Sequence, residues 1–343
     1  MDTGTLLCMN LLQMARAWVY PEEILLSEQF NFGNREVLIV CNDLNRESLF
    51  LSSVQHGWYP ENTTRPIPGI QSKFGRQYPY LAWSTRFRDL LKKEGYSKIF
   101  ATGSPWSHLL RNLKIDPRAI KESGEEKGRL LFFPRHSAPG ITIEHNVKLD
   151  HVAKVAGASD ITVCLFWLDF IDPAIRNFYE KYGCKIACVG YRGSSGFETP
   201  WAPIGGRTLF LPRILELMES HDLIAVDEVS TSFWYALSLR KKVIITSDLE
   251  NFDGWGGGAK VKLRASNLEW LDLVSSNLKN IGIMQLIDPD EDLVEIALAE
   301  LGWDCALDFK RLIELGQIKT KERIDKSLTD SLESHLLLLK SVR

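Results

Sequence analysis

The chain has 343 residues, which at the usual domain size of roughly 100–200 residues favours two domains. Its 45% hydrophobic and 25% charged residues are ordinary globular values, so the composition excludes a collagen-like repeat, a coiled coil and extensive disorder. The formal net charge of −3 gives no indication of nucleic-acid binding, and we expect no nucleic-acid partner.

In the first half, apolar runs of strand length alternate with a helical pattern. They predict strands over residues 36–41, 80–83 and 98–102 and a helix over residues 85–94. The connection over residues 58–77 is rich in Pro, Gly, Asn and Arg, and a loop of that length in a compact domain is often functional.

The second half repeats this alternation more regularly. Continuous apolar runs predict strands over residues 130–133, 161–166, 185–189, 223–226 and 243–246, with helices over 175–182, 211–220 and 230–239 between them. This order predicts a parallel sheet covered by helices on both faces.

The expected fold class is therefore α/β, with two domains of similar type facing a cleft and a helical C-terminal tail. A charged run at residues 121–127 marks the boundary between a domain over 1–125 and a second domain over 126–300. The tail, residues 301–343, is expected to pack back on both domains.

The cysteines and the N-terminus indicate the compartment. Six cysteines lie in apolar surroundings, with no CxxC pair and no zinc-site spacing, so we expect reduced thiols in a cytoplasmic protein. No signal peptide is visible, and no apolar run approaches the ~18 residues of a spanning helix. Peripheral association with the inner face of a membrane remains open.

The residues directly after the predicted strands are the candidate site residues, because open α/β sheets bind ligands at the carboxyl ends of their strands. After the strand at 223–226, Asp227 and Glu228 precede the hydroxyls of Ser230, Thr231 and Ser232 at the start of a helix. A helix N-terminus with hydroxyls can bind a phosphate, although simple capping explains the same residues.

Segment 222–248 resembles the donor-binding βαβ unit of GT-B-fold glycosyltransferases. The resemblance implies two Rossmann-like domains of GT-B type, with Glu228, Ser230, Thr231 and Ser232 holding the nucleotide of an activated sugar.

The strand at 130–133 is followed by Arg135, His136 and Ser137. Arg can clamp a phosphate and His can donate a proton to a leaving phosphate, although a loop His often bonds only to backbone. The segment resembles the His-containing loops of bacterial sialyltransferases and CDP-glycerol glycerophosphotransferases, which implies that all three residues contact the donor and that His136 is catalytic.

His56 and Gly57 open the long first-half loop, and a His beside a Gly suits a general base for an acceptor hydroxyl. A structural His explains the same pattern. The pair resembles the His-Gly motif of glycerophosphotransferases and capsule polysaccharide transferases, whose usual preceding acid is Gln55 here. The resemblance implies catalysis by His56, with Gly57 on the acceptor side.

Two further positions complete the expected site. Ser104, in a Gly-Ser-Pro turn after the strand at 98–102, resembles the acceptor-side turn of the same transferases, although alone it indicates only a turn. Gly190 begins a Gly-rich loop that could approach the donor closely. No Asp-x-Asp motif stands where a metal-dependent transferase needs one, so we expect neither a cofactor nor an obligatory metal.

Together these features predict a glycosyltransferase that moves a sugar from a CMP-, CDP- or UDP-linked donor to an oligosaccharide or lipid-linked acceptor of a bacterial surface polysaccharide or lipopolysaccharide. Two alternatives stay open. A sugar-nucleotide epimerase on the same fold would need carboxylates at the hexose, for which Asp227, Glu228 and Glu198 are candidates. A non-catalytic nucleotide-sugar-binding protein would need none.

Overall fold

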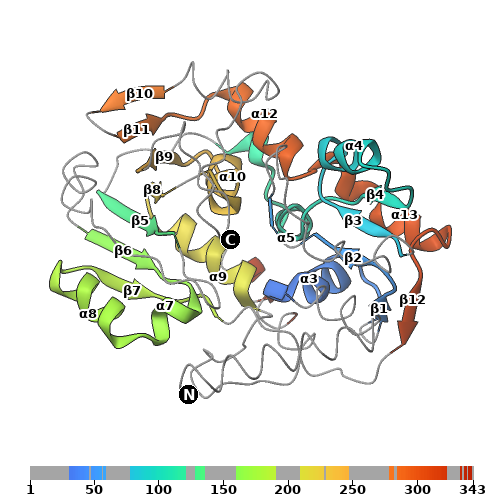
Figure 1. Cartoon of the computed structure of the whole chain (residues 1–343), viewed down its shortest axis with the longest axis horizontal. Coiled ribbons are helices and arrows are strands. Elements are labelled where there is room, and N and C mark those ends of the chain that lie inside the picture. The colour runs from blue at the N-terminus through green and yellow to red at the C-terminus, as the bar shows by residue number, and fades with distance from the viewer. Residues whose placement is uncertain are drawn as a thin grey trace.

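The computed structural model describes residues 31–45, 48–55, 57–58, 78–120, 128–135, 160–190, 209–227, 229–246, 278–281 and 284–322, with parts of 333–341. Within these ranges the chain is an α/β protein with a seven-stranded, a three-stranded and a two-stranded sheet (Figure 1).

The seven-stranded sheet belongs to the second half of the chain. From edge to edge its strands are β10 (Leu278–Ile281), β11 (Met284–Ile287), β9 (Lys242–Ile245), β8 (Leu223–Val226), β5 (Arg129–Phe133), β6 (Asp160–Cys164) and β7 (Lys185–Ala187). The five strands from β9 to β7 are parallel, whereas β11 and β10 extend the sheet as antiparallel strands.

The strand order contains one reversal of direction. From β5 the chain continues outward to β6 and β7, then returns to place β8 on the other side of β5 and β9 beyond it. Ligands of open parallel sheets bind where the order reverses, outside the carboxyl ends of the two strands concerned. The strand order therefore predicts that a ligand would bind at the carboxyl ends of β5 and β8.

Alternate residues of each strand pack on opposite faces of this sheet, as the pleat requires. Leu130 lies in a cluster with Tyr179 of α8 (Pro173–Lys181), whereas Leu131 lies in a cluster with Leu215 of α9 (Phe210–Glu219) and Trp234 of α10 (Thr231–Ser238). Helices thus cover both faces, which accounts for the continuous apolar strands. The short α7 (Trp167–Ile171) precedes α8.

The three-stranded sheet is parallel and has the order β2 (Ser53–Val54), β3 (Tyr80–Ala82) and β4 (Ile99–Ala101). Phe87 and Leu91 of α4 (Thr85–Lys93) pack against one face. The other face packs against α3 (Asn34–Cys41) and α13 (Phe309–Glu314). Beside it, β1 (Ser48–Phe50) pairs antiparallel with β12 (Thr320–Glu322), which brings the C-terminal segment back to the first half.

Local signals fix where several helices begin. Ser84 caps α4, Ser104 caps α5 (Pro105–Asn112) and Asp290 caps α12 (Glu291–Glu300), each accepting a hydrogen bond from a backbone N–H of the first turn. Pro105 follows its cap at a position where the missing N–H costs nothing.

Most predicted elements are confirmed, with ends that differ by a few residues. The strands at 80–83, 98–102, 130–133, 161–166, 185–189, 223–226 and 243–246 are present, as are the helices at 85–94, 175–182, 211–220 and 230–239. The strand predicted over residues 36–41 is wrong, because these residues belong to α3. A short apolar run that is buried on all sides fits a helix as well as a strand.

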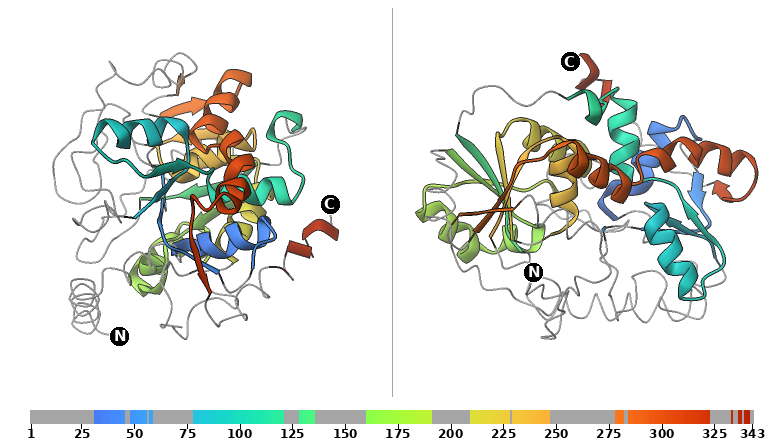
Figure 2. Two further views of the ribbon diagram at one scale, coloured as in Figure 1. Left: turned by 90° about the vertical axis from the view of Figure 1, so that its right-hand side faces the viewer. Right: turned by 90° about the horizontal axis from the view of Figure 1, so that it is seen from above.

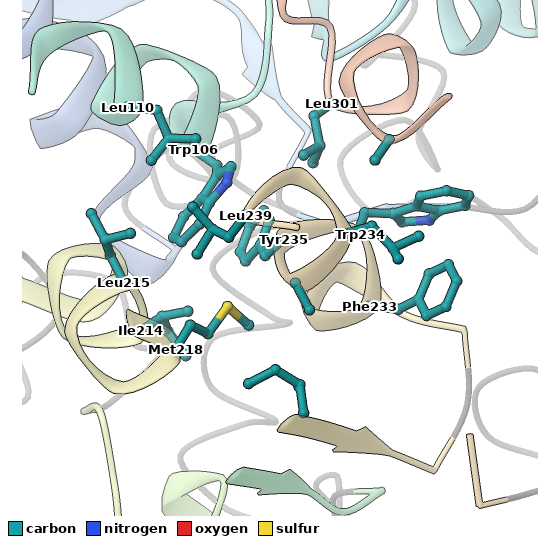
Figure 3. Packing of buried hydrophobic residues seen from close by; sticks show 14 of the residues in the cluster. Trp106, Leu110, Ile214, Leu215, Met218, Phe233, Trp234, Tyr235, Leu239 and Leu301 are labelled. Atoms are coloured by element: carbon teal, nitrogen blue, oxygen red, sulfur yellow. The ribbon is translucent and has the colours of Figure 1, made fainter. Parts of the chain in front are cut away.

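The two larger sheets lie on either side of α9, α10, α5 and α3 (Figures 1 and 2). They fall on opposite sides of residue 125, but the core does not divide there. Trp106 of α5 stacks on Tyr235 of α10 at 4.2 Å and donates from Nε1 to Ser238 Oγ at 3.0 Å. It packs among side chains of α9 and α10 (Figure 3).

The C-terminal residues also return to this core. Leu336 is buried in the same cluster as Trp106, and Leu339 packs against that cluster. None of the described helices is both long enough and apolar enough to cross a lipid bilayer. The five described cysteines are free thiols.

Candidate functional site at the carboxyl ends of the parallel strands

Asp227 lies directly after β8, at the reversal point of the seven-stranded sheet. Its Oδ2 accepts the backbone N–H of Arg135, which follows β5, at 2.7 Å. Its Oδ1 accepts the hydroxyl of Thr246, which follows β9. One carboxylate therefore ties together the ends of three neighbouring strands and holds the backbone of Arg135 at the edge of the sheet.

One tyrosine and two cysteines near this edge have raised pKa values, which makes them poor nucleophiles. Burial raises the pKa of Tyr179, and the negative charges of Asp227 and Asp169 raise it further. Burial likewise raises the pKa of the Cys164 and Cys188 thiols, which keeps them protonated at neutral pH. Covalent catalysis by these groups is therefore not supported.

The helix α10 begins at Thr231, four residues after Asp227 along the chain, with Ser230 at its N-cap position. Ser230, Thr231 and Ser232 are half-buried, and the Ser230 side chain does not cap the helix. The N–H groups of a first turn point out of the helix and carry the positive end of its dipole. With the hydroxyls beside them, they form a site suited to a phosphate or carboxylate.

A loop from the other sheet contacts this helix start. The backbone N–H of Trp58, which follows β2, donates to Thr231 Oγ1 at 2.9 Å. A Cβ added to Gly57 would lie 3.4 Å from the same oxygen, so the neighbouring backbone passes close to the hydroxyl. Two segments selected independently from the sequence, the His-Gly loop and the Ser-Thr-Ser helix start, are thus brought together.

Gln55 fixes the backbone of that loop. Its Nε2 donates to the carbonyl of Gly57 at 2.8 Å, and its Oε1 accepts the backbone N–H of Trp83 at 2.7 Å. The indole Nε1 of Trp83 donates to the Gln55 carbonyl at 2.8 Å. An amide can donate and accept at once, which an ionised carboxylate cannot. This accounts for Gln, and not an acid, at position 55.

Behind the loop, a partly buried ion pair holds the Trp58 side chain. Glu300, at the end of α12, is 5% exposed and accepts Trp58 Nε1–H at 2.6 Å through Oε2. Arg86 of α4 donates to both oxygens of Glu300, from Nε at 2.5 Å and from the second nitrogen at 2.6 Å. The Trp58 ring packs against Trp234 of α10 at 5.4 Å. Sequence reasoning missed Glu300, Arg86 and Trp58.

Two predicted residues, Ser104 and Gly190, form no hydrogen bond with Trp58 or Thr231 among the described residues. Ser104 is fully buried as the cap of α5, its Oγ accepting the N–H of Ser107 at 3.1 Å, and its own N–H donates to the Leu301 carbonyl at 2.8 Å. Gly190 follows β7 with a φ of +127°, and β7 is two strand spacings, about 10 Å, from β5. The roles predicted for both residues stay predictions.

The remaining predicted residues, His56, His136, Ser137 and Glu228, lie outside the described residues, as does Glu198. Within the described ranges, no group of three or more His, Cys, Asp or Glu side chains could hold a metal ion.

Comparison with known proteins adds no relative: no family model, curated protein or solved structure matches the chain. The function is therefore inferred from the contact between the Gly57–Trp58 loop and the start of α10.

Proposed function

We propose that the protein is a glycosyltransferase of GT-B type that binds a nucleotide-activated sugar at the carboxyl ends of β5 and β8. In this proposal both halves are Rossmann-like domains, and the acceptor is an oligosaccharide or lipid-linked saccharide of a surface polysaccharide. The contact of the Gly57–Trp58 loop with Thr231 carries the proposal, because it joins a helix start whose N–H groups suit an anion to a loop from the other sheet.

The strand order of the seven-stranded sheet supports the proposal that the ligand is a nucleotide. Counted in chain order, the parallel strands lie as 3-2-1-4-5, the order of the first five strands in dinucleotide-binding sheets. Arg135 and Asp227 stand at the reversal point, and α10 begins just beyond it. A donor phosphate at α10 would receive backbone N–H groups, the hydroxyls of Ser230 and Thr231, and the charge of Arg135.

The proposed reaction is a displacement at the anomeric carbon. The acceptor oxygen forms the new bond to that carbon while His56 accepts its proton. The bond from carbon to phosphate oxygen breaks, and the nucleotide leaves with the electron pair. The first turn of α10 and Arg135 stabilise the negative charge that develops on the phosphate, and His136 donates a proton to it.

A donor screen tests the proposal with the full-length protein. Binding of CMP-, CDP- and UDP-sugars is measured by calorimetry, and transfer is measured by mass spectrometry with mixed saccharide acceptors. Thr231→Val should weaken affinity for the bound nucleotide about tenfold, because it removes a hydroxyl from the phosphate site while keeping the side-chain shape.

Thr85→Val is the matched control, because Thr85 is also the first residue of a helix, is exposed, and lies in α4, which packs on the other sheet. Its nucleotide affinity should equal that of the wild type. The proposal fails if no nucleotide-activated donor binds. An isomerised nucleotide sugar formed without any acceptor supports an epimerase instead, and binding without turnover supports a non-catalytic protein.

A further inference from the structure

The hydroxyl of Thr231 has one hydrogen-bond partner among the described residues, the backbone N–H of Trp58. A hydroxyl has a single hydrogen to donate and two lone pairs that accept. Since Trp58 donates to the oxygen, the Thr231 hydrogen is directed away from Trp58, and no acceptor for it lies among the described residues. An accepted hydrogen bond also polarises the hydroxyl and strengthens it as a donor.

Trp58 is in turn fixed by charge. Its indole N–H, together with two N–H groups of Arg86, converges on the Glu300 carboxylate at 2.5 to 2.6 Å. The guanidinium carbon of Arg86 lies 6.0 Å from the centre of the Trp58 ring. Charge-assisted hydrogen bonds of this length are stronger than neutral ones and hold a fixed geometry. The chain of contacts therefore runs from Arg86 and Glu300 through Trp58 to Thr231.

We infer that Glu300 and Arg86 are positioning residues for donor binding: through Trp58 they orient the Thr231 hydroxyl toward the phosphate of the nucleotide. This inference rests on the proposed function, because it assumes an anionic ligand at α10. Neither residue touches the ligand. The elements that supply them, α12 and α4, lie outside the seven-stranded sheet, so the first sheet and the segment after the second sheet together set the geometry of the donor site.

The test is a double-mutant cycle between Glu300→Gln and Thr231→Val, read as nucleotide affinity. Gln has one acceptor oxygen, and its NH₂ group opposes the N–H groups that a carboxylate accepts. In one orientation of the amide Arg86 Nε loses its acceptor, and in the other both Trp58 Nε1 and the second Arg86 nitrogen lose theirs, while the side-chain volume is kept. Glu300→Gln should weaken nucleotide affinity about fivefold when Thr231 is present and less than about twofold in the Thr231→Val background.

Glu295→Gln is the control on the same helix. Glu295 forms a similar two-bond pair with Arg118, at 2.6 and 2.9 Å, but the pair is exposed and makes no contact with Trp58. It should leave nucleotide affinity unchanged in both backgrounds. Urea unfolding of each variant separates lost affinity from lost fold.

The outcomes distinguish the inference from the function on which it rests. If the wild type binds no nucleotide, the proposed function fails. If the wild type binds and Glu300→Gln has no effect, or weakens affinity equally with and without the Thr231 hydroxyl, the positioning role is overturned while the proposed function stands.

Discussion

The imidazole of His108 is enclosed in the core, at 3% exposure. Nδ1 accepts a hydrogen bond from Asn42 Nδ2 at 3.0 Å, and Nε2 donates to the Thr102 carbonyl at 2.8 Å, an arrangement that requires the neutral ring. Burial lowers the pKa of His108 from 6.5 to about 4; the Arg111 charge lowers it too, whereas the bond to Thr102 opposes the shift.

We predict that His108 makes the fold less stable as the pH falls from about 6.5 to about 4. In that window the unfolded chain binds a proton that the folded protein does not, so protonation favours unfolding. At 1.36 kcal/mol per pKa unit, the loss is about 2 kcal/mol between pH 7 and pH 5. Urea unfolding of wild type and His108→Gln at both values measures it, since Gln does not titrate. A difference between the two proteins that stays constant with pH would contradict the assignment.

The sequence carried usable signals for Arg86 and Glu300. Glu300 lies seven residues after Leu293, on the apolar stripe of α12, and an acid in a last turn opposes the helix dipole. Arg86 opposes the dipole in the first turn of α4. Each charge is unfavourable at its own helix end, and the ion pair between the two side chains compensates for this. Periodicity could flag both residues, but only the fold places the two helix ends together.

At the scale of elements, the turn after α12 closes over the carboxyl ends of β3 and β4. Gly302 has a φ of +66°, and a Cβ added there would lie 1.8 Å from the carbonyl oxygen of Trp83. A Cβ on Gly103 would lie 2.7 Å from Ala306 Cβ. The contact is backbone against backbone, so it has no flexible side chain that could move aside.

Gly302→Ala should therefore cost more than about 4 kcal/mol of the free energy of unfolding, a range reached only when packing or backbone is disrupted. Gly95→Ala is the matched comparison, because Gly95 also has a positive φ, +88°, but nothing lies within 4 Å of an added Cβ. It should cost only the backbone strain, about 1–2 kcal/mol. Chemical denaturation of both variants measures the difference, and equal losses would rule out the close approach.

The second-half strands were predictable because strands of a parallel sheet that is covered on both faces are continuous β-branched apolar runs. Turn residues on either side mark where such a run ends. Residues 36–41 show the limit of that reasoning. Val37, Leu38 and Ile39 are all buried, against α5 on one side and Phe50 and Phe309 on another. A segment enclosed on every side needs no amphipathic pattern, so tertiary contacts, not periodicity, decide between helix and strand.

At the scale of the whole molecule, length alone favoured two independent domains, yet one cluster crosses the expected boundary. Trp106 of the first half packs with α9 and α10 of the second, and Leu301 and Trp303 after α12 join the same cluster (Figure 3). Further along, Phe309 and Ile318 complete the cluster around Phe50 in the first half. The first sheet, which ends at Ala101, is thus covered by residues more than 200 positions further along the chain.

We predict that the two halves unfold together, although proteins of this length commonly show separate transitions. In calorimetry the wild type should give one transition, with the van't Hoff enthalpy equal to the calorimetric enthalpy. Trp106→Ala should lower the free energy of unfolding by about 3–5 kcal/mol through the cavity it leaves. It should move that transition as a whole to lower temperature, because Trp106 serves the cores of both halves at once. Two resolved transitions in the wild type would show that the shared cluster does not couple the halves. If the wild type melts once and Trp106→Ala melts in two steps, Trp106 itself is the coupling.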